Sequence, residues 1–148
     1  MIRHAKITDS SAIQKINYEQ LGYDYPLIKT QTSMQHLLAD PHHLILVAED
    51  AHTGKITGYV HAELYQETYF DPMLNIMALA VSSAAQHRGI GTALMTAVEE
   101  YAKEKQITAI RLNSSTNRTG AHQFYAKIGY SFDKTQKRFS KKLPSKFN

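Results

Sequence analysis

The sequence predicts an α/β fold of the mixed α+β type, with a central, twisted, mostly antiparallel sheet of about seven strands flanked by about four helices. Three observations predict it. Residues 74–81 form a nearly continuous apolar run, which is typical of a buried strand. A glycine-bearing turn then leads into a long amphipathic helix and a further strand, so these two strands should be parallel. Upstream, two strand-like segments joined by the turn 50–54 indicate an antiparallel hairpin.

The expected elements follow from local patterns in chain order. The first helix begins at Thr8 or Asp9, both good capping residues, and the second ends before Pro41. The last helix ends at Gly129, the expected residue after a helix end. We expect strands at residues 2–7, 44–49, 55–66, 74–81, 108–113, 130–133 and 136–142. We expect the helices around residues 12–16, at about 32–39, from the glycine turn to about 105, and at 118–128.

The turn at residues 86–94 is the most informative local motif. It holds Gly89 and Gly91, which let the backbone approach a ligand closely, and the amides that start the next helix could point at phosphate oxygens. A helix dipole favours an anion there by about 0.3–1 kcal/mol. Backbone geometry alone also places glycines at such turns. By itself, the motif therefore fits both a diphosphate cradle and a plain turn.

Length and composition restrict the class of protein. With 148 residues, 43% of them hydrophobic, the chain predicts one domain over 1–148, with 143–148 as a frayed tail. The absence of cysteine excludes disulfides, thiolate metal sites and a cysteine nucleophile. No apolar stretch reaches the roughly 18 residues of a membrane span, and no signal-peptide pattern is present. We therefore expect a cytoplasmic protein with no membrane partner. His36, His42 and His43 lack metal-ligand spacing, so no metal site is expected.

The net charge of +4 is concentrated near the C-terminus. Six basic residues and one acidic residue lie within 133–148, which leaves the rest of the chain near neutral. Because no stripe elsewhere interleaves aromatic with basic residues, we expect no nucleic-acid partner. The predicted terminal strands could instead pair across a homodimer.

Two motifs resemble the hallmarks of the GNAT N-acetyltransferase superfamily. Val81, followed after four residues by Gln-x-x-Gly-x-Gly at 86–91, is similar to the acetyl-CoA signature of that family. Residues 117–130 match its second hallmark, an Asn followed by a helix that ends in Phe-Tyr-x-x-(apolar)-Gly-(aromatic). The order of the elements from residue 2 to about residue 143 also follows the family. The resemblance implies the GNAT fold, with the fourth and fifth strands splayed apart, and acetyl-CoA as cosubstrate.

The resemblance also implies the cofactor-binding residues. The pantetheine arm would meet the main chain of the fourth strand, and the pyrophosphate would meet the glycine turn. Asn117 would cap the last helix and reach the cofactor arm, although a plain N-cap explains this residue as well. The implied cofactor-binding residues are Leu79, Ala80, Val81, Gln86, His87, Arg88, Gly89, Ile90, Gly91, Thr92, Asn117 and Tyr125.

For catalysis, the resemblance implies that Tyr125 hydrogen-bonds the thioester sulfur and protonates the departing thiolate; a core tyrosine is the alternative. A phenol, with a pKa of about 10, is a weaker acid than a thiol. We therefore expect Tyr125 to contribute chiefly a charge-assisted hydrogen bond to the developing thiolate. Many relatives place a glutamate base four residues before the valine, where this chain has Met77. The polar face of the preceding strand offers Glu63 or His61 instead. A water relay, or plain solvated residues on this strand, are the alternatives.

The acceptor site follows from the same resemblance. Tyr23, Tyr25 and Tyr65, with nearby carboxylates, could hold a cationic amine, although an exposed loop explains them equally. We expect transfer of the acetyl group from acetyl-CoA to a primary amine of a small cationic molecule, rather than of a protein, by direct attack in a ternary complex. The alternative is a catalytically silent acyl-CoA-binding module with a regulatory or sensor role.

Overall fold

The computed structural model describes residues 1–145 and confirms the predicted α/β class. The chain divides into two compact units, Met1–Asn113 and a second unit that begins at Ser114. All described strands lie in the first unit. They are β1 (Ile2–His4), β2 (His43–Glu49), β3 (Ile56–Glu67), β4 (Phe70–Val81) and β5 (Ile110–Leu112).

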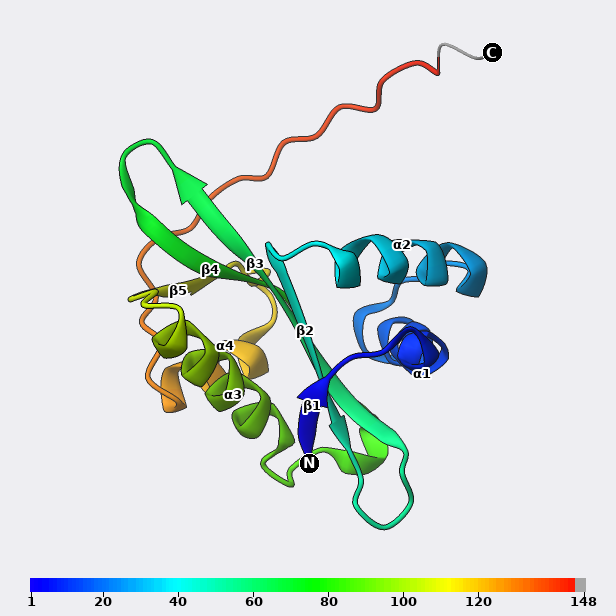
Figure 1. Ribbon diagram of the computed structural model, residues 1–148. Helices are drawn as coiled ribbons and strands as arrows, with labels where there is room; N and C mark the ends of the chain where they lie inside the picture. The colour runs from blue at the N-terminus through cyan, green and yellow to red at the C-terminus, as the bar shows by residue number, and fades with distance from the viewer. Residues whose placement is uncertain (146–148) are drawn as a thin grey trace. The chain divides into compact units, whose positions relative to one another are not determined.

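The five strands form one sheet in the order β1-β2-β3-β4-β5. The pairs from β1 to β4 are antiparallel, and β4 with β5 is parallel, as the hairpin and the strand–helix–strand pattern predict. Figure 1 shows β2, β3 and β4 as the long central strands of this unit.

Helices of the first unit cover both faces of the sheet (Figure 1). On one face lie α1 (Ser10–Ile16), continued by a π-helical turn Asn17–Leu21, and α2 (Leu27–Ala39). On the other lies α3 (Ile90–Glu104). α2 begins earlier than predicted, directly after Pro26. The sequence pattern did not reveal this start, because residues 27–29 are exposed and lie outside the apolar repeat of the helix. The buried core that these two helices share with the sheet contains Ala5, Ile13, Ile16, Met34, Ile45, Val47, Tyr59 and Ala80.

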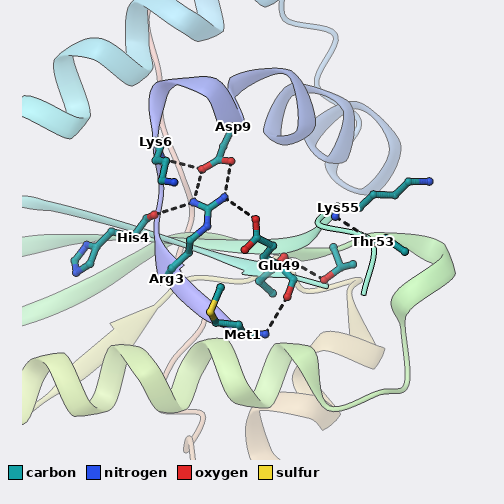
Figure 2. A network of polar contacts seen from close by, with 10 residues as sticks. Met1, Arg3, His4, Lys6, Asp9, Glu49, Thr53 and Lys55 are labelled. Carbon is teal, nitrogen blue, oxygen red and sulfur yellow. Dashed lines mark hydrogen bonds and ion pairs between the residues drawn. The ribbon is translucent and has the colours of Figure 1, made fainter. Parts of the chain in front are cut away.

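An ion-pair network holds the start of α1 to the edge of the sheet (Figure 2). Arg3 of β1 donates to both carboxylate oxygens of Asp9, at 2.8 and 3.0 Å, and to Glu49 at 3.4 Å. Asp9 stands at the N-cap of α1, but its carboxylate accepts from Arg3 and from the Lys6 amide instead of capping the helix. Burial pushes the pKa of Asp9 upward, but the hydrogen bonds from Arg3 and Lys6 outweigh it and leave this pKa below its usual value.

The two strands predicted at 130–133 and 136–142 are wrong. Residues 128–145 form neither helix nor strand, and every residue from 131 to 145 is exposed. A strand needs ladder partners, and this basic segment has no apolar face whose burial would hold it against a sheet. The described sheet therefore has five strands rather than about seven. Of the predicted frayed tail, residues 143–145 are exposed and irregular, and 146–148 lie outside the described residues.

The second unit contains α4 (Thr119–Lys127). The predicted end at Gly129 is confirmed: Gly129 has φ +103°, its amide donates to Ala126, and the Tyr130 amide donates to Tyr125. The predicted capping role of Asn117 is wrong, because Arg118 occupies the N-cap and no side chain caps the helix. The Arg118 amide turns back to donate to the carbonyl of Ser115, so the helix starts one residue later. Within residues 1–145, no helix is long and apolar enough to cross a membrane.

Candidate active site

The sheet opens between β4 and β5, as the resemblance implies. Pairing with β5 covers only Leu74–Ile76, yet β4 continues to Val81. The opening begins at Met77, an extra residue on β4 where the register with β3 shifts between His61 and Ala62. A bulge of this kind bends a strand and ends its regular pairing. Among residues 1–145, the last residues of β4 therefore have a strand partner on the β3 side only.

The peptide groups of Leu79 and Val81 face the open side of β4. The Ser82 amide donates to the Thr57 carbonyl of β3 at 2.8 Å, and the register pairs Ala80 with Tyr59. Because backbone groups in an antiparallel ladder alternate between the two sides, those of Leu79 and Val81 point away from β3. In agreement, the Val81 carbonyl accepts a hydrogen bond from the Gln86 side chain at 3.2 Å.

The glycine turn adds free backbone donors at the start of α3. Gly89 is the N-cap, with φ +77°, a conformation that favours glycine, whereas Gly91 lies inside the helix. The first helical bond runs from the Ala93 amide to Gly89 at 2.9 Å. No side chain caps α3, and no acceptor for the amides of residues 90–92 is found in the described part of the chain. These amides can therefore bind an anion.

Gly58 of β3 lets α3 come close to the sheet. A Cβ at this position would lie 3.0 Å from the Ala80 carbonyl oxygen and 3.3 Å from the Ile90 side chain. The sequence reasoning missed this residue, although a glycine inside an alternating strand is a signal of close backbone approach.

A chain of amide hydrogen bonds joins the glycine turn to the end of α1. Gln20, in the π-helical turn, donates to the Ser83 hydroxyl at 2.7 Å and accepts from the Gln86 side chain at 3.0 Å. The segment that follows α1 is thereby held beside the turn that precedes α3.

A cavity of about 200 Å³ lies beside this region, between the sheet and α1 and α2. Its apolar lining residues are Ile13, Met34, Leu37 and Ile45. Its polar lining residues are Asn17, Tyr25, Thr30, Ser33, Tyr59 and His61. The structure thus brings together two predicted site residues, His61 and Tyr25. Of the polar residues that the sequence reasoning missed, Tyr59 precedes His61 by two positions and so shares its strand face.

The cavity lies one strand away from the open side of β4. Tyr59 pairs with Ala80 in the β3–β4 register, and His61 pairs with Ala78. Neighbouring strands are about 4.8 Å apart. A group bound along the open side of β4 is therefore within reach of a molecule in the cavity.

His61 belongs to a hydrogen-bonded pair. Its Nε2 lies 3.0 Å from Nδ1 of His43, and Nε2 of His43 lies 3.9 Å from a carboxylate oxygen of Asp40. Burial, together with the neighbouring His43, lowers the pKa of His61 to about 4. His61 is therefore neutral at pH 7. Tyr59, whose hydroxyl donates to Asn17, is also kept neutral, because burial raises its pKa to about 12.

The other predicted residues of this face lie outside the cavity lining. Glu63 stands between His43 and Asn75 in the sheet register. Tyr65 packs under Arg111, whose guanidinium carbon is 4.5 Å from the ring centre. Tyr23 is 64% exposed. None of these three residues is part of the cavity lining that contains His61 and Tyr25.

Tyr125 lies on α4 in the second unit. Its ring is half-buried and makes edge-on contacts with Phe124, at 5.2 Å between centroids, and with Tyr130, at 6.0 Å. Burial raises the pKa of Tyr125, and the charge of Arg118 opposes this only in part. The phenol therefore keeps its proton at neutral pH and is a hydrogen-bond donor.

Comparison with known proteins is consistent with these features. A family model described as "Acetyltransferase (GNAT) family" matches residues 11–130. The chain is similar to glucosamine 6-phosphate N-acetyltransferase 1 of Oryza sativa subsp. japonica, 32% identical over 90 residues, which are 60% of this chain and 53% of that protein. It is also similar to the uncharacterized protein YdhI of Bacillus subtilis, 39% identical over 54 residues, which are 36% of this chain and 34% of that protein. The chain thus spans about a third to a half of these curated relatives.

Solved structures share the fold. The aminoglycoside 6'-N-acetyltransferase AAC(6')-Ih of Acinetobacter baumannii superposes with a TM-score of 0.84, at 20% identity, over 97% of this chain and 99% of the other. The likeness, at this identity, is one of fold. It confirms the mixed α/β architecture that the motifs imply.

Proposed function

Because this chain belongs to the GNAT acetyltransferase family, we propose that it is an acetyl-CoA-dependent N-acetyltransferase that acts on a primary amine of a small molecule. One observation carries the proposal: the open side of β4 presents the peptide groups of Leu79 and Val81 and leads directly into an uncapped helix start. An extended arm with amides and a terminal diphosphate needs these two features in this order.

The described residues fit acetyl-CoA. The outward peptide groups of β4 can pair with the amides of a pantetheine arm in the way that a strand would. The free amides after Gly89 can bind the pyrophosphate, and the exposed Arg88 can add a charge-assisted contact. When bound, acetyl-CoA supplies the thioester carbonyl that the amine attacks.

The amine must lose a proton for the reaction, and we propose that His61 receives it once the nitrogen has begun to bond the carbonyl carbon, because an imidazole with a pKa of about 4 is too weak a base to deprotonate a free ammonium group. We propose the tautomer in which His43 carries its proton on Nε2, 3.9 Å from a carboxylate oxygen of Asp40, and Nδ1 of His43 accepts from Nε2–H of His61. This tautomer leaves a lone pair on Nδ1 of His61, in a residue that lines the cavity. The new N–C bond forms as the C–S bond breaks, and the proton reaches His61 directly or through water. Glu63 remains the second candidate for this role.

On the basis of the resemblance, we propose that Tyr125 interacts with the leaving thiolate. As the C–S bond breaks, negative charge develops on sulfur, and a phenol that keeps its proton can donate a hydrogen bond to it.

Cytoplasmic location, preference for a small molecule over a protein, and formation of a homodimer remain predictions.

Met77 supports the alternative of a silent acyl-CoA-binding module. It occupies the position where the resemblance implies a glutamate base, and its side chain is 50% exposed and cannot take a proton. In such a module, acetyl-CoA would bind without being consumed.

The test is release of free thiol from acetyl-CoA with a broad panel of primary amines, in the wild type and in Tyr125→Phe. We expect thiol release in the wild type, and a kcat about 100-fold lower in the variant with unchanged stabilisation by acetyl-CoA. Thermal stabilisation by acetyl-CoA without thiol release from any amine would favour the silent module. Neither stabilisation nor release would contradict both.

A further inference from the structure

The cavity beside β4 has polar walls without charged side chains. Among the described residues, its lining contains no Asp, Glu, Lys or Arg. His61 is neutral at pH 7, because burial lowers its pKa. Its polar residues are Asn17, Tyr25, Thr30, Ser33, Tyr59 and His61, of which the Thr30 hydroxyl donates to the Pro26 carbonyl and the Tyr59 hydroxyl to Asn17.

Neutral walls affect the two forms of an amine differently. Removing an ammonium group from water without a carboxylate partner favours its neutral form, which is the form that attacks a thioester. The cavity therefore raises the fraction of the reacting nitrogen that is in the neutral, nucleophilic form. A second ammonium group, or a carboxylate, elsewhere on the acceptor takes no part in the reaction. Moving this charge from water into the cavity costs free energy, because no charged side chain of the lining pairs with it.

The size and the pattern of the lining add two further restrictions. The cavity of about 200 Å³ has room for roughly seven water molecules at about 30 Å³ each. The lining combines the apolar residues Ile13, Met34, Leu37 and Ile45 with uncharged polar residues. The matching ligand is compact, with an apolar part and uncharged polar substituents.

We propose that the acceptor is a compact monoamine: one basic nitrogen, an apolar part, and substituents such as hydroxyls that carry no charge. This inference rests on the proposed N-acetyltransferase function and narrows its acceptor class. The sequence led us to expect a small cationic molecule. A monoamine meets that expectation, because its reacting amine carries one positive charge in water. Polyamines, and amines that bear phosphate or carboxylate, are disfavoured.

The experiment uses sets of amines that differ in one group. 4-Aminobutan-1-ol, 1,4-diaminobutane and 4-aminobutanoate share a carbon chain and differ in the charge of the far end. Glucosamine and glucosamine 6-phosphate form a second set. Thiol release from acetyl-CoA gives kcat/KM for each. Within each set, we expect the uncharged substituent to be preferred at least about tenfold, as an unpaired buried charge costs that much or more.

A variant then tests whether the walls of the cavity cause the preference. Asn17→Asp keeps an oxygen that accepts from Tyr59 and adds one negative charge to the lining. We expect this variant to use the diamine better, with kcat/KM for the diamine rising about tenfold relative to kcat/KM for the amino alcohol. Gln35→Glu makes the same change of charge on α2 at an exposed residue outside the lining, and should leave the ratio unchanged.

The outcomes are distinguishable. If diamines or charged amines are used as well as the uncharged ones, the monoamine inference is overturned while the N-acetyltransferase function stands. If only the uncharged amines are used and Asn17→Asp shifts the ratio, the inference is supported. If no amine releases thiol although acetyl-CoA stabilises the protein, the proposed function fails, and the acceptor class fails with it.

Discussion

The glycine turn and the cavity are neighbouring parts of the first unit, but they are built in different ways. The turn and the end of β4 present backbone groups from one continuous stretch, Leu79–Thr92. The cavity presents side chains from α1, its π-helical extension, α2, β2 and β3. The first surface depends on backbone geometry, and the second on the identity of several side chains.

This difference separates the two halves of the proposed reaction. A backbone surface tolerates most side-chain changes and suits an invariant ligand such as a cosubstrate. A side-chain surface changes with single substitutions and so determines which acceptor enters. Variants in the two regions should therefore affect different measurements.

The largest expected effect is on turnover, from the cavity. His61→Gln should lower kcat at least about 100-fold, because it removes the proposed proton acceptor. Stabilisation by acetyl-CoA should stay at the wild-type level, since the backbone surface is untouched. Glu63→Gln is the matched control on the same strand. If kcat fell in Glu63→Gln but stayed normal in His61→Gln, the role of proton acceptor would belong to Glu63 instead.

The next effect is on binding, from the turn. Saturation at 100 Kd stabilises a protein by roughly 2.7 kcal/mol, and Gly89→Glu should remove most of that gain, because it strains the N-cap and brings a negative charge to the anion site. Gly54→Glu places the same side chain at another positive-φ glycine with open space, in the β2–β3 loop. A thermal shift with acetyl-CoA that is equal in both variants would contradict the cradle.

The third effect is on acid stability, again from the cavity. An unfolded histidine binds a proton near pH 6.5, whereas folded His61 does so only near pH 4. Between these two pH values, the unfolded state therefore binds more protons than the folded state. The stability that the neutral His61 contributes is fully present above pH 6.5 and is lost as the pH falls toward 4. From pH 7 to pH 5, this loss should be about 2 kcal/mol. Urea unfolding should show a steeper pH dependence in the wild type than in His61→Gln, and equal slopes would refute the shift.

The smallest effect should come from a side chain at the turn. Arg88→Ala removes one exposed charge but no backbone donor, so the affinity for acetyl-CoA should fall only about twofold, or about 0.4 kcal/mol. Calorimetric titration at low and high salt would measure it. A tenfold loss would show that side chains, and not the backbone, dominate this surface.

The sequence predicted the elements whose signals are local. The apolar run of β4, the alternation of β3, the glycine turn and the helix end at Gly129 each depend on a few adjacent residues, and all four appear in the structure. The predicted terminal strands failed because strand formation depends on a partner that the local pattern of residues 130–142 does not specify. Asn117 failed as a cap because the backbone at Ser115–Arg118 turns before the helix begins.

The sequence alone determined the order of the elements as far as α4, the class of fold and the position of the glycine turn, because these follow from short-range periodicity and backbone preference. Only the tertiary structure decided which side chains share a cavity. His61 and Asn17 are far apart in the chain and line one cavity because α1 and its π-helical extension pack on β3 and β4. His43 reaches His61 through the pairing of β2 with β3. Contacts of this kind depend on packing between elements, which no local pattern encodes.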